Sequence, residues 1–314
     1  MQSPKPKPPL IIILGPTAVG KTATSITLAE RLYAEIISAD SRLFYRGMDI
    51  GTAKPTEAER QRVTHHLIDV ADPDQIWSLA KYLRAAREII DEIHAREKLP
   101  LLVGGTGQYI RAMVEGWQVP EVNPDPRLRD RLEAWAEQIS PEGLHARLQV
   151  LDAPAAAKID PPNLRRTVRA LEVILTTGQR FSRQKGRKPP PYSILQIGLR
   201  RPREEIYDRV DARIQHMLAT GLIEETQELL DQGYSPQLPP LSAIGYRQVV
   251  QYLNDQISLE EVVKIMKRKT RKFVRHQANW FSEDDPNIHW VDAGPGAAEK
   301  MEALIQEFLK KIKK

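Results

Sequence analysis

The sequence predicts an α/β protein in which a parallel sheet is flanked by helices and interrupted by an all-helical insertion. Four short apolar runs, at residues 10–14, 34–39, 99–103 and 193–199, have the length and composition of buried strands. Helical segments separate the first three runs, which is the alternation typical of parallel sheets. From residue 117 to 191 the composition changes to helical stretches and prolines, which indicates the insertion.

The first strand leads into a loop with the spacing G-x-x-x-x-G-K-T, followed by a helix from Ala23 to about Leu32. Strand, loop and helix in this order are typical of a phosphate site, because the loop amides and the helix N-terminus point at an anion. The predicted phosphate-binding residues are Gly15, Pro16, Thr17, Ala18, Val19, Gly20, Lys21 and Thr22. Lys21 adds a positive charge, and the Thr22 hydroxyl can bind Mg²⁺. A nucleoside triphosphate is the default ligand of such a loop, but any diphosphate with Mg²⁺ would satisfy the same donors.

The next two strands end in different residues. Asp40 follows the second strand and is expected at the same sheet edge as Thr22, which makes it a catalytic candidate. The third strand ends in glycines and Thr106, where a nucleotide hydrolase would carry an acid to position Mg²⁺ and water. Glycines at this place would let a ligand approach the backbone, so we expect an acceptor to bind there.

The insertion and the segment after it have recognisable helix boundaries. Asp125 and Asn163 are expected to cap the starts of two helices in the insertion, and Gly178 to end the second. A helix after Pro202 carries Arg209 and Arg213 four residues apart, and a guanidinium near a diphosphate would bind the leaving group. Ser258 opens the last long helix.

Composition limits the classes of protein that need consideration. The 314 residues allow one large domain or two ordinary ones. With no cysteine, disulfides, thiolate nucleophiles and cysteine-based zinc sites are excluded, and a cytoplasmic location is expected. No apolar run is long enough to span a membrane. The first nine residues are rich in proline and lysine without an apolar core, so we expect a flexible leader.

Positive charge is concentrated in two segments. Seven lysines and arginines lie between Lys264 and His276 without an acid, and five lie between Arg180 and Lys188. A single cluster is commonly a solvated surface, but several in a chain of net charge +5 favour a polyanionic partner such as nucleic acid.

Five segments closely resemble the tRNA dimethylallyltransferases, also called tRNA isopentenyltransferases, which modify adenosine 37 beside the anticodon. The segments are Gly15 to Thr22, Asp40 to Leu43 with Tyr45 to Pro55, Leu101 to Thr106, Ala243 to Gln248, and Arg275 to Trp280. The resemblance runs in order from about Leu10 to Trp290. It implies a P-loop NTPase-like core at residues 10–116 and 192–295, an insertion at 117–191 that binds the anticodon stem-loop, and flexible termini at 1–9 and 305–314.

The resemblance also implies a chemistry. Dimethylallyl diphosphate and Mg²⁺, the latter at Thr22, would occupy the phosphate loop in place of a nucleoside triphosphate. Asp40 would take the proton of the attacking adenine N6. Lys21, Thr22 and Arg213 would stabilise the departing pyrophosphate. We expect a monomer with tRNA as partner and no membrane association, although nothing in the sequence excludes a dimer.

Most of the expected tRNA contacts come from the resemblance alone. Only the arginines at 165–169 and the basic run from Lys264 to His276 are also indicated by charge. The resemblance assigns tRNA contacts to Asp40, Ser41, Arg42, Leu43, Thr106, Arg129, Arg165, Arg166, Thr167, Val168, Arg169, Ala243, Ile244, Gly245, Tyr246, Arg247, Gln248, Arg275, His276, Gln277, Ala278, Asn279, Trp280, Phe281 and Ser282.

Two other classes of protein remain in competition with a prenyltransferase. A small-molecule P-loop kinase or hydrolase explains the phosphate loop, but neither the missing acid after Val103 nor the basic helices. A non-catalytic RNA-binding module explains the basic helices but leaves the phosphate loop without a role.

Overall fold

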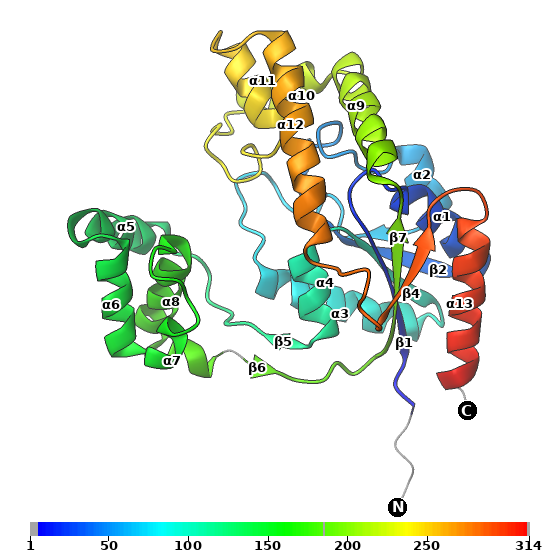
Figure 1. The fold of residues 1–314 in the computed structure, drawn as a ribbon, viewed down its shortest axis with the longest axis horizontal. Coiled ribbons are helices and arrows are strands. Elements are labelled where there is room, and N and C mark those ends of the chain that lie inside the picture. The colour runs from blue at the N-terminus through cyan, green and yellow to red at the C-terminus, as the bar shows by residue number, and fades with distance from the viewer. Residues whose placement is uncertain (1–5, 185, 313–314) are drawn as a thin grey trace, which may run out of the picture. The chain divides into compact units, whose positions relative to one another are not determined.

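A six-stranded parallel sheet forms the centre of the first of two compact units. The computed structural model describes residues 6–184 and 186–312. The strand order is β3-β2-β4-β1-β7-β8 (Figure 1). The strands are β1 (Pro9–Leu14), β2 (Ala34–Ala39), β3 (His65–His66), β4 (Leu99–Gly104), β7 (Ser193–Arg200) and β8 (Ile288–Asp292). The four predicted strands are confirmed, while the sequence analysis did not identify β3 or β8. Because all pairings are parallel, the carboxyl ends of the strands share one edge.

The first unit contains the described parts of Met1–Trp77, Arg84–Val114 and Pro190–Lys314. Its helices include α1 (Lys21–Leu32), α2 (Glu57–Arg62), most of α3 (Leu79–Ala95), and α4 (Gly107–Val114). After β7 follow α9 (Arg203–Ala219), α10 (Leu222–Asp231), α11 (Tyr246–Leu253), α12 (Leu259–Ala278) and α13 (Ala297–Ile312). No helix in the described part of the chain is long and apolar enough to cross a membrane.

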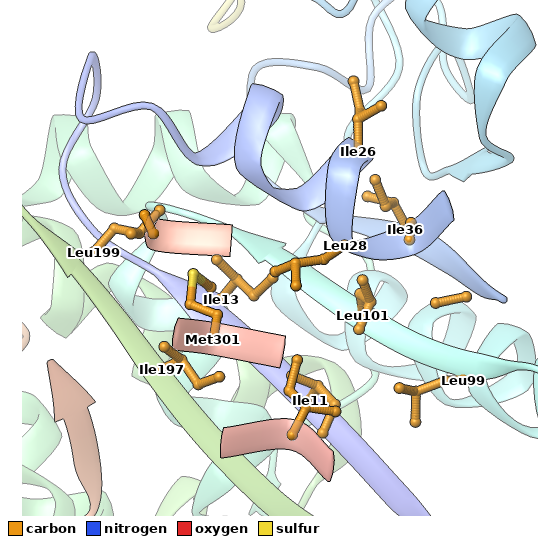
Figure 2. Close-up of a cluster of buried hydrophobic side chains, with 14 of the residues drawn as sticks. Ile11, Ile13, Ile26, Leu28, Ile36, Leu99, Leu101, Ile197, Leu199 and Met301 are labelled. Carbon is orange, nitrogen blue, oxygen red and sulfur yellow. The ribbon is translucent and has the colours of Figure 1, made fainter. Parts of the chain in front are cut away.

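The apolar core of this unit lies between the sheet and the helices α1 and α13. Ile11 and Ile13 of β1 contribute to it together with Leu28 of α1 and Met301 of α13 (Figure 2). Leu10, Ile12 and Leu14 alternate with them along β1 and are also fully buried, so both faces of the strand are covered. This explains the continuous apolar run in the sequence. Each such side chain contributes about 1.5–3 kcal/mol to folding.

The predicted flexible end at residues 305–314 is wrong for residues 305–312. They form the second half of α13, where Ala297, Met301 and Ile305 repeat every four residues and are buried. The helix packs against α1, and Arg31 bonds Glu299 and Glu302 across this contact. Residues 313–314 and residues 1–5 of the expected leader lie outside the described range.

The second unit contains Ser78–Leu83 and Glu115–Pro189. The expected insertion was residues 117–191. Its helices are α5 (Pro126–Ile139), α6 (Pro141–Leu151), α7 (Ala153–Ala156) and α8 (Leu164–Thr177), with the short 3-10 helix η1 (Phe181–Arg183). Asp125 and Asn163 cap α5 and α8 as predicted, and Gly178 ends α8 with a φ of 68°. Unlike the prediction, the unit is not entirely helical, because β5 (Trp117–Gln118) and β6 (Gly186–Arg187) pair antiparallel. The charge cluster at Arg180 to Lys188 includes Lys185, which lies outside the described residues.

Candidate active site

The loop from Gly15 to Gly20 connects β1 to α1 at the carboxyl edge of the sheet, as predicted. Gly15 has a φ of 149°, and a Cβ atom there would lie 2.6 Å from the Leu199 carbonyl oxygen. Only glycine therefore fits where the loop leaves the strand. Gly20 occupies the cap position of α1 with no side-chain hydrogen bond to the helix. The first N–H groups of α1 can therefore bind an anion.

Lys21 lies back over this loop. Its Nζ donates to the carbonyl oxygens of Gly15 at 2.9 Å and Pro16 at 2.8 Å. Burial lowers the pKa of the Lys21 ammonium to about 8; the charge of Asp40 opposes this shift and that of Arg213 adds to it. Lys21, Asp40 and Arg213, three of the four predicted catalytic residues, therefore lie close enough to influence one another's charge. An anion bound at the loop would stabilise the ammonium form.

Arg209 and Arg213 share one side of α9, as their spacing predicted, and both reach the phosphate loop, where they contact different parts of it. Arg209 Nε donates to the Ala18 carbonyl at 2.7 Å. The Arg213 guanidinium lies 3.4 Å from Thr17 Oγ1, and burial lowers its pKa. Arg209 therefore holds the loop backbone, while Arg213 lines the adjacent cavity, where it can contact a ligand.

Asp40 follows β2 and is held by the backbone of its own turn. Its Oδ1 accepts the Arg42 N–H at 3.0 Å, and within the described residues no hydrogen bond engages its second carboxylate oxygen. The neighbouring Ser41 N–H donates to Thr106 Oγ1 at 3.2 Å, and the Thr106 N–H donates to the Ala39 carbonyl. The ends of β2 and β4 are therefore tied together, with one carboxylate oxygen available to a ligand.

A cavity of about 380 Å³ lies beside the phosphate loop. Thr17, Asp40 and Arg213 give it polar walls, while Thr106, His276 and Trp280 line it from other segments. A second wall is apolar: it is formed by Val210, Ile214 and Met217, which lie on one face of α9, and by Met266 and Phe273 of α12. A cavity that joins a phosphate-binding loop to an apolar wall can hold a ligand with both a phosphate group and an apolar group.

Gly105 and Gly107 line the cavity, so a ligand can approach their backbone, while the side of each residue that a Cβ atom would occupy is filled by the protein. A Cβ atom at Gly105 would lie 2.5 Å from Gln277 Nε2, and one at Gly107 would lie 2.1 Å from Trp280 Cγ. The space beside the backbone is occupied by side chains of α12 and the residues just after it. In this loop the side chain of Thr106 faces the cavity.

Glu225 of α10, which the sequence analysis did not identify, joins two of the family-like segments. Its carboxylate accepts the N–H groups of Asp49 at 2.7 Å, Ile50 at 2.7 Å and Gly51 at 3.0 Å. It also accepts the Tyr246 hydroxyl at 2.6 Å, and burial raises the pKa of this tyrosine. The segment from Tyr45 to Pro55 is thereby fixed to the start of α11. No spacing rule predicts such a contact.

Several residues expected to contact tRNA have buried side chains. Tyr246, Gln248 and Ala243 are buried in the first unit, as are Gln277 and Phe281. Gln248 Oε1 accepts the Gly245 N–H, so this amide stabilises its own helix start. The expectation of side-chain contacts with tRNA is corrected for Tyr246, Gln248 and Phe281, because the protein itself surrounds them. Ala243 and Gln277 line the cavity, and for them a contact stays a prediction. Exposed or half-exposed members of the two segments are Ile244, Arg247, Arg275, His276, Ala278, Asn279, Trp280 and Ser282.

A similar correction applies within the second unit. Thr167 and Val168 are buried in its core. Arg129 forms two hydrogen bonds of 2.8 Å with the fully buried Glu172, and Arg169 bonds the same carboxylate at 2.6 Å. Burial alone would raise the pKa of Glu172, but the hydrogen bonds from these arginines hold it below its ordinary value. Arg129 and Arg169 therefore stabilise the unit, while Arg165 and Arg166 remain exposed.

The site offers few protein ligands for Mg²⁺. Among the described residues, no cluster of three or more histidine, cysteine, aspartate or glutamate side chains could bind a metal. The Thr22 hydroxyl is exposed and has no hydrogen-bond partner in the described part of the chain. Mg²⁺ in phosphate sites commonly takes one or two protein oxygens and completes its shell with phosphate and water. The residues present fit this mode of binding.

A parallel sheet with a phosphate loop at its carboxyl edge and an adjoining apolar cavity defines a P-loop protein acting on a phosphorylated substrate. A family model described as IPP transferase matches residues 43–284. The chain is 48% identical over 303 residues to a tRNA dimethylallyltransferase of Thermomicrobium roseum, covering 96% of this chain and 92% of the relative. It is 50% identical over 300 residues to one of Roseiflexus castenholzii, covering 95% and 98%. The chain therefore belongs to the IPP transferase family.

Solved structures agree with this assignment. The crystal structure of the full-length tRNA isopentenylpyrophosphate transferase from Bacillus halodurans matches with a TM-score of 0.72 and 39% identity, covering 98% of both chains. A eukaryotic dimethylallyltransferase acting on tRNA matches with a TM-score of 0.83 and 25% identity, covering 97% of this chain and 80% of that one. The resemblance found in the sequence and the predicted fold class are confirmed, and the protein is a prenyltransferase.

Proposed function

We propose that this enzyme transfers the dimethylallyl group of dimethylallyl diphosphate to N6 of adenosine 37 in tRNA and releases pyrophosphate. The observation that carries the proposal is the cavity in which Asp40 and Arg213 meet the phosphate loop beside an apolar wall. The loop and Arg213 would bind the diphosphate, and Val210, Ile214 and Met217 would cover the five-carbon chain. Covering this chain excludes water, which would otherwise compete with adenine for the allylic carbon.

The reaction forms one carbon–nitrogen bond and breaks one carbon–oxygen bond. Adenine N6 attacks the primary carbon of the prenyl group, and the bonding electrons leave with pyrophosphate. The N6 lone pair is delocalised into the ring, so bond formation must be accompanied by loss of a proton. The unengaged oxygen of Asp40 would accept this proton. Lys21, the loop amides and Arg213 would stabilise the leaving pyrophosphate.

Mg²⁺ would be held by the Thr22 hydroxyl together with diphosphate oxygens, where it supplies positive charge to the leaving group. Adenine must leave its stack in the anticodon loop to enter the cavity. We propose that the second unit and the exposed basic face of α12 bind the anticodon stem-loop. Arg165 and Arg166 and the exposed part of α12 supply the positive charge this requires. The proposal includes a monomeric enzyme in the cytoplasm.

The test is mass spectrometry of nucleosides from unmodified tRNA incubated with the protein, dimethylallyl diphosphate and Mg²⁺. We expect N6-isopentenyladenosine, and none from a tRNA with guanosine at position 37. No appreciable tRNA-dependent ATP hydrolysis is expected, because the strand ending at Gly104 provides no acid for it. Rapid ATP turnover without prenyl transfer would overturn the proposal in favour of a kinase or hydrolase.

A further inference from the structure

Gln277, near the end of α12, is a buried amide placed between two loops of the site. It is 6% exposed. Its Oε1 accepts the Thr17 N–H of the phosphate loop at 2.8 Å, and its Nε2 donates to the Gly105 carbonyl after β4 at 3.0 Å. The orientation of the amide is fixed, because a backbone N–H can only donate and a carbonyl can only accept. One side chain therefore joins the two loops.

The amide of Gln277 is packed closely between the two loops. A Cβ atom at Gly105 would lie 2.5 Å from Gln277 Nε2 and 3.1 Å from the Gly15 carbonyl oxygen. One turn further along the chain, Trp280 lies against Gly107 and also lines the cavity. The end of α12 is thus in contact with both loops at once.

Each loop would bind a different substrate of the proposed reaction. Thr17 is part of the loop that would hold the diphosphate. Gly105 precedes Thr106, whose hydroxyl accepts the Ser41 N–H beside Asp40, where adenine would bind. Hydrogen bonds therefore link the phosphate loop to Gln277 and Gln277 to Gly105, and the adjacent Thr106 is hydrogen-bonded to Ser41, the neighbour of the predicted base. Only a side chain with both a donor and an acceptor can make the central link.

We propose that Gln277 is a positioning residue that couples the two substrate sites. Diphosphate bound at the phosphate loop fixes Thr17 and, through Gln277, the Gly105 loop in the arrangement that adenine requires. RNA bound in the acceptor site fixes the phosphate loop in return, since coupling between two binding sites is reciprocal. This inference rests on the proposed function. It also assigns to Gln277 a role other than the tRNA contact that its position in the sequence suggested.

The test measures the affinity for an anticodon stem-loop RNA with and without an unreactive donor. The donor is a dimethylallyl diphosphate analogue with CH₂ in place of the bridging oxygen, at saturating concentration with Mg²⁺. We expect the analogue to tighten RNA binding at least about fivefold in the wild-type protein. In Gln277→Met, which keeps the side-chain volume but removes both hydrogen bonds, the ratio should fall to within about twofold of one. Gln306→Met, on the exposed face of α13, is the matched control and should keep the wild-type ratio.

A purely structural role would weaken both affinities or the stability without changing this ratio. Gly105→Ala displaces the same amide from the opposite side and provides a second variant should Gln277→Met fail to fold. A wild-type ratio of one, or an unchanged ratio in a folded variant, would overturn the coupling. Failure of the proposed function is recognised separately, because wild-type protein would then not prenylate the RNA at all.

Discussion

One carboxylate oxygen of Asp40 accepts the Arg42 N–H. A substitution can therefore remove the proton-accepting ability of the side chain and keep this hydrogen bond. In Asp40→Asn the amide oxygen can keep that bond, so the turn should persist while the ability to accept a proton is lost. We expect near-normal binding of both substrates and a transfer rate lowered by about 10² to 10⁴. Single-turnover kinetics with both substrates saturating is the measurement.

The matched control is Asp74→Asn, which makes the same change at an exposed position outside the cavity. It should transfer at the wild-type rate. A rate for Asp40→Asn within about threefold of wild type would show that Asp40 is not the base. A loss confined to tRNA affinity would make it a base-binding residue.

Lys21 predicts a pH dependence of diphosphate binding. Burial lowers the pKa of Lys21 from 10.5 to about 8, so the protein without ligand loses this positive charge as the pH rises above 8. When an anion is bound at the loop, Lys21 stays protonated to higher pH. Affinity for the unreactive donor should therefore fall by about tenfold per pH unit above pH 8. Folding stability should show the opposite trend. Between pH 8 and 10.5 the unfolded chain keeps the Lys21 proton while the folded protein has lost it, so the free energy of unfolding increases as the pH rises through this range.

Titration calorimetry on Lys21→Arg separates this effect from ionisation of the ligand, since arginine stays charged throughout. The ratio of wild-type to Lys21→Arg affinity should decline above pH 8. A ratio that is constant from pH 7 to 10 would mean that Lys21 does not titrate in this range.

At the scale of elements, α12 carries two rows of positive charge with different partners. Lys267 and Arg271 both bind Asp211 of α9, the helix beside it (Figure 1). Lys264, Arg268 and Lys272 repeat every four residues along another line and have no ion-pair partner in the described chain. The first row therefore stabilises the helix pair, and the second is available to RNA phosphates.

Replacing Lys264, Arg268 and Lys272 together by alanine should weaken tRNA binding. It should also flatten the dependence of log K on log salt by about 0.7 to 0.9 per lost contact. Filter binding across salt concentrations measures both quantities. Lys267→Ala is the matched control and should leave the slope unchanged. An unaltered slope in the triple variant would mean that this row is merely solvated.

The sequence predicted α12 from its serine cap and its basic run, but it could not sort the charges into these rows. The sorting depends on Asp211, which lies some 55 residues earlier and shares no motif with them. The same limit applies to Gln277, which was assigned to tRNA because of its neighbours in the chain. The phosphate loop was predictable because strand, loop and helix are contiguous. Contacts such as Glu225 with Asp49 join distant segments and leave no periodic signal.

At the scale of the whole molecule, the second unit depends on Glu172. Replacing it by glutamine leaves Arg129 and Arg169 without a charged partner, and losing hydrogen bonds to a charged group costs about 1.5–3 kcal/mol. We expect the unit to unfold in a separate, earlier thermal transition. The full chain should then lose tRNA affinity but still bind the unreactive donor. Glu133→Gln, an exposed change on α5, serves as control.

Acid should have the same effect on the wild-type unit. The folded pKa of Glu172 lies below its ordinary value, so its stabilising contribution is complete above about pH 4.3 and decreases as the pH falls below it. Calorimetry between pH 3 and 7 measures this change. A single transition in Glu172→Gln at the wild-type temperature would contradict the assigned role.

The overall architecture was predictable because its central strands are continuous apolar runs and its insertion differs in composition. Strand β8 and helix α13 were missed. The sequence of β8 is short and contains His289 and Trp290, and the charges of α13 conceal its buried stripe at Met301 and Ile305. Both elements follow the last family-like motif. The resemblance placed β8 within the core but did not identify it as a strand, and it ended before α13.

The pairing of β1 with β7 also has a consequence for synthesis of the chain. Leu10 through Leu14 pair with residues about 180 positions later, and α13 covers the same strand later still. At roughly 5–20 residues per second, a ribosome needs about 10 to 40 seconds to deliver β7 after β1. During that interval β1 has at least one open edge, and it has two until β4 is made. The N-terminal strand, although it is translated first, should therefore need protection by a chaperone for the longest time.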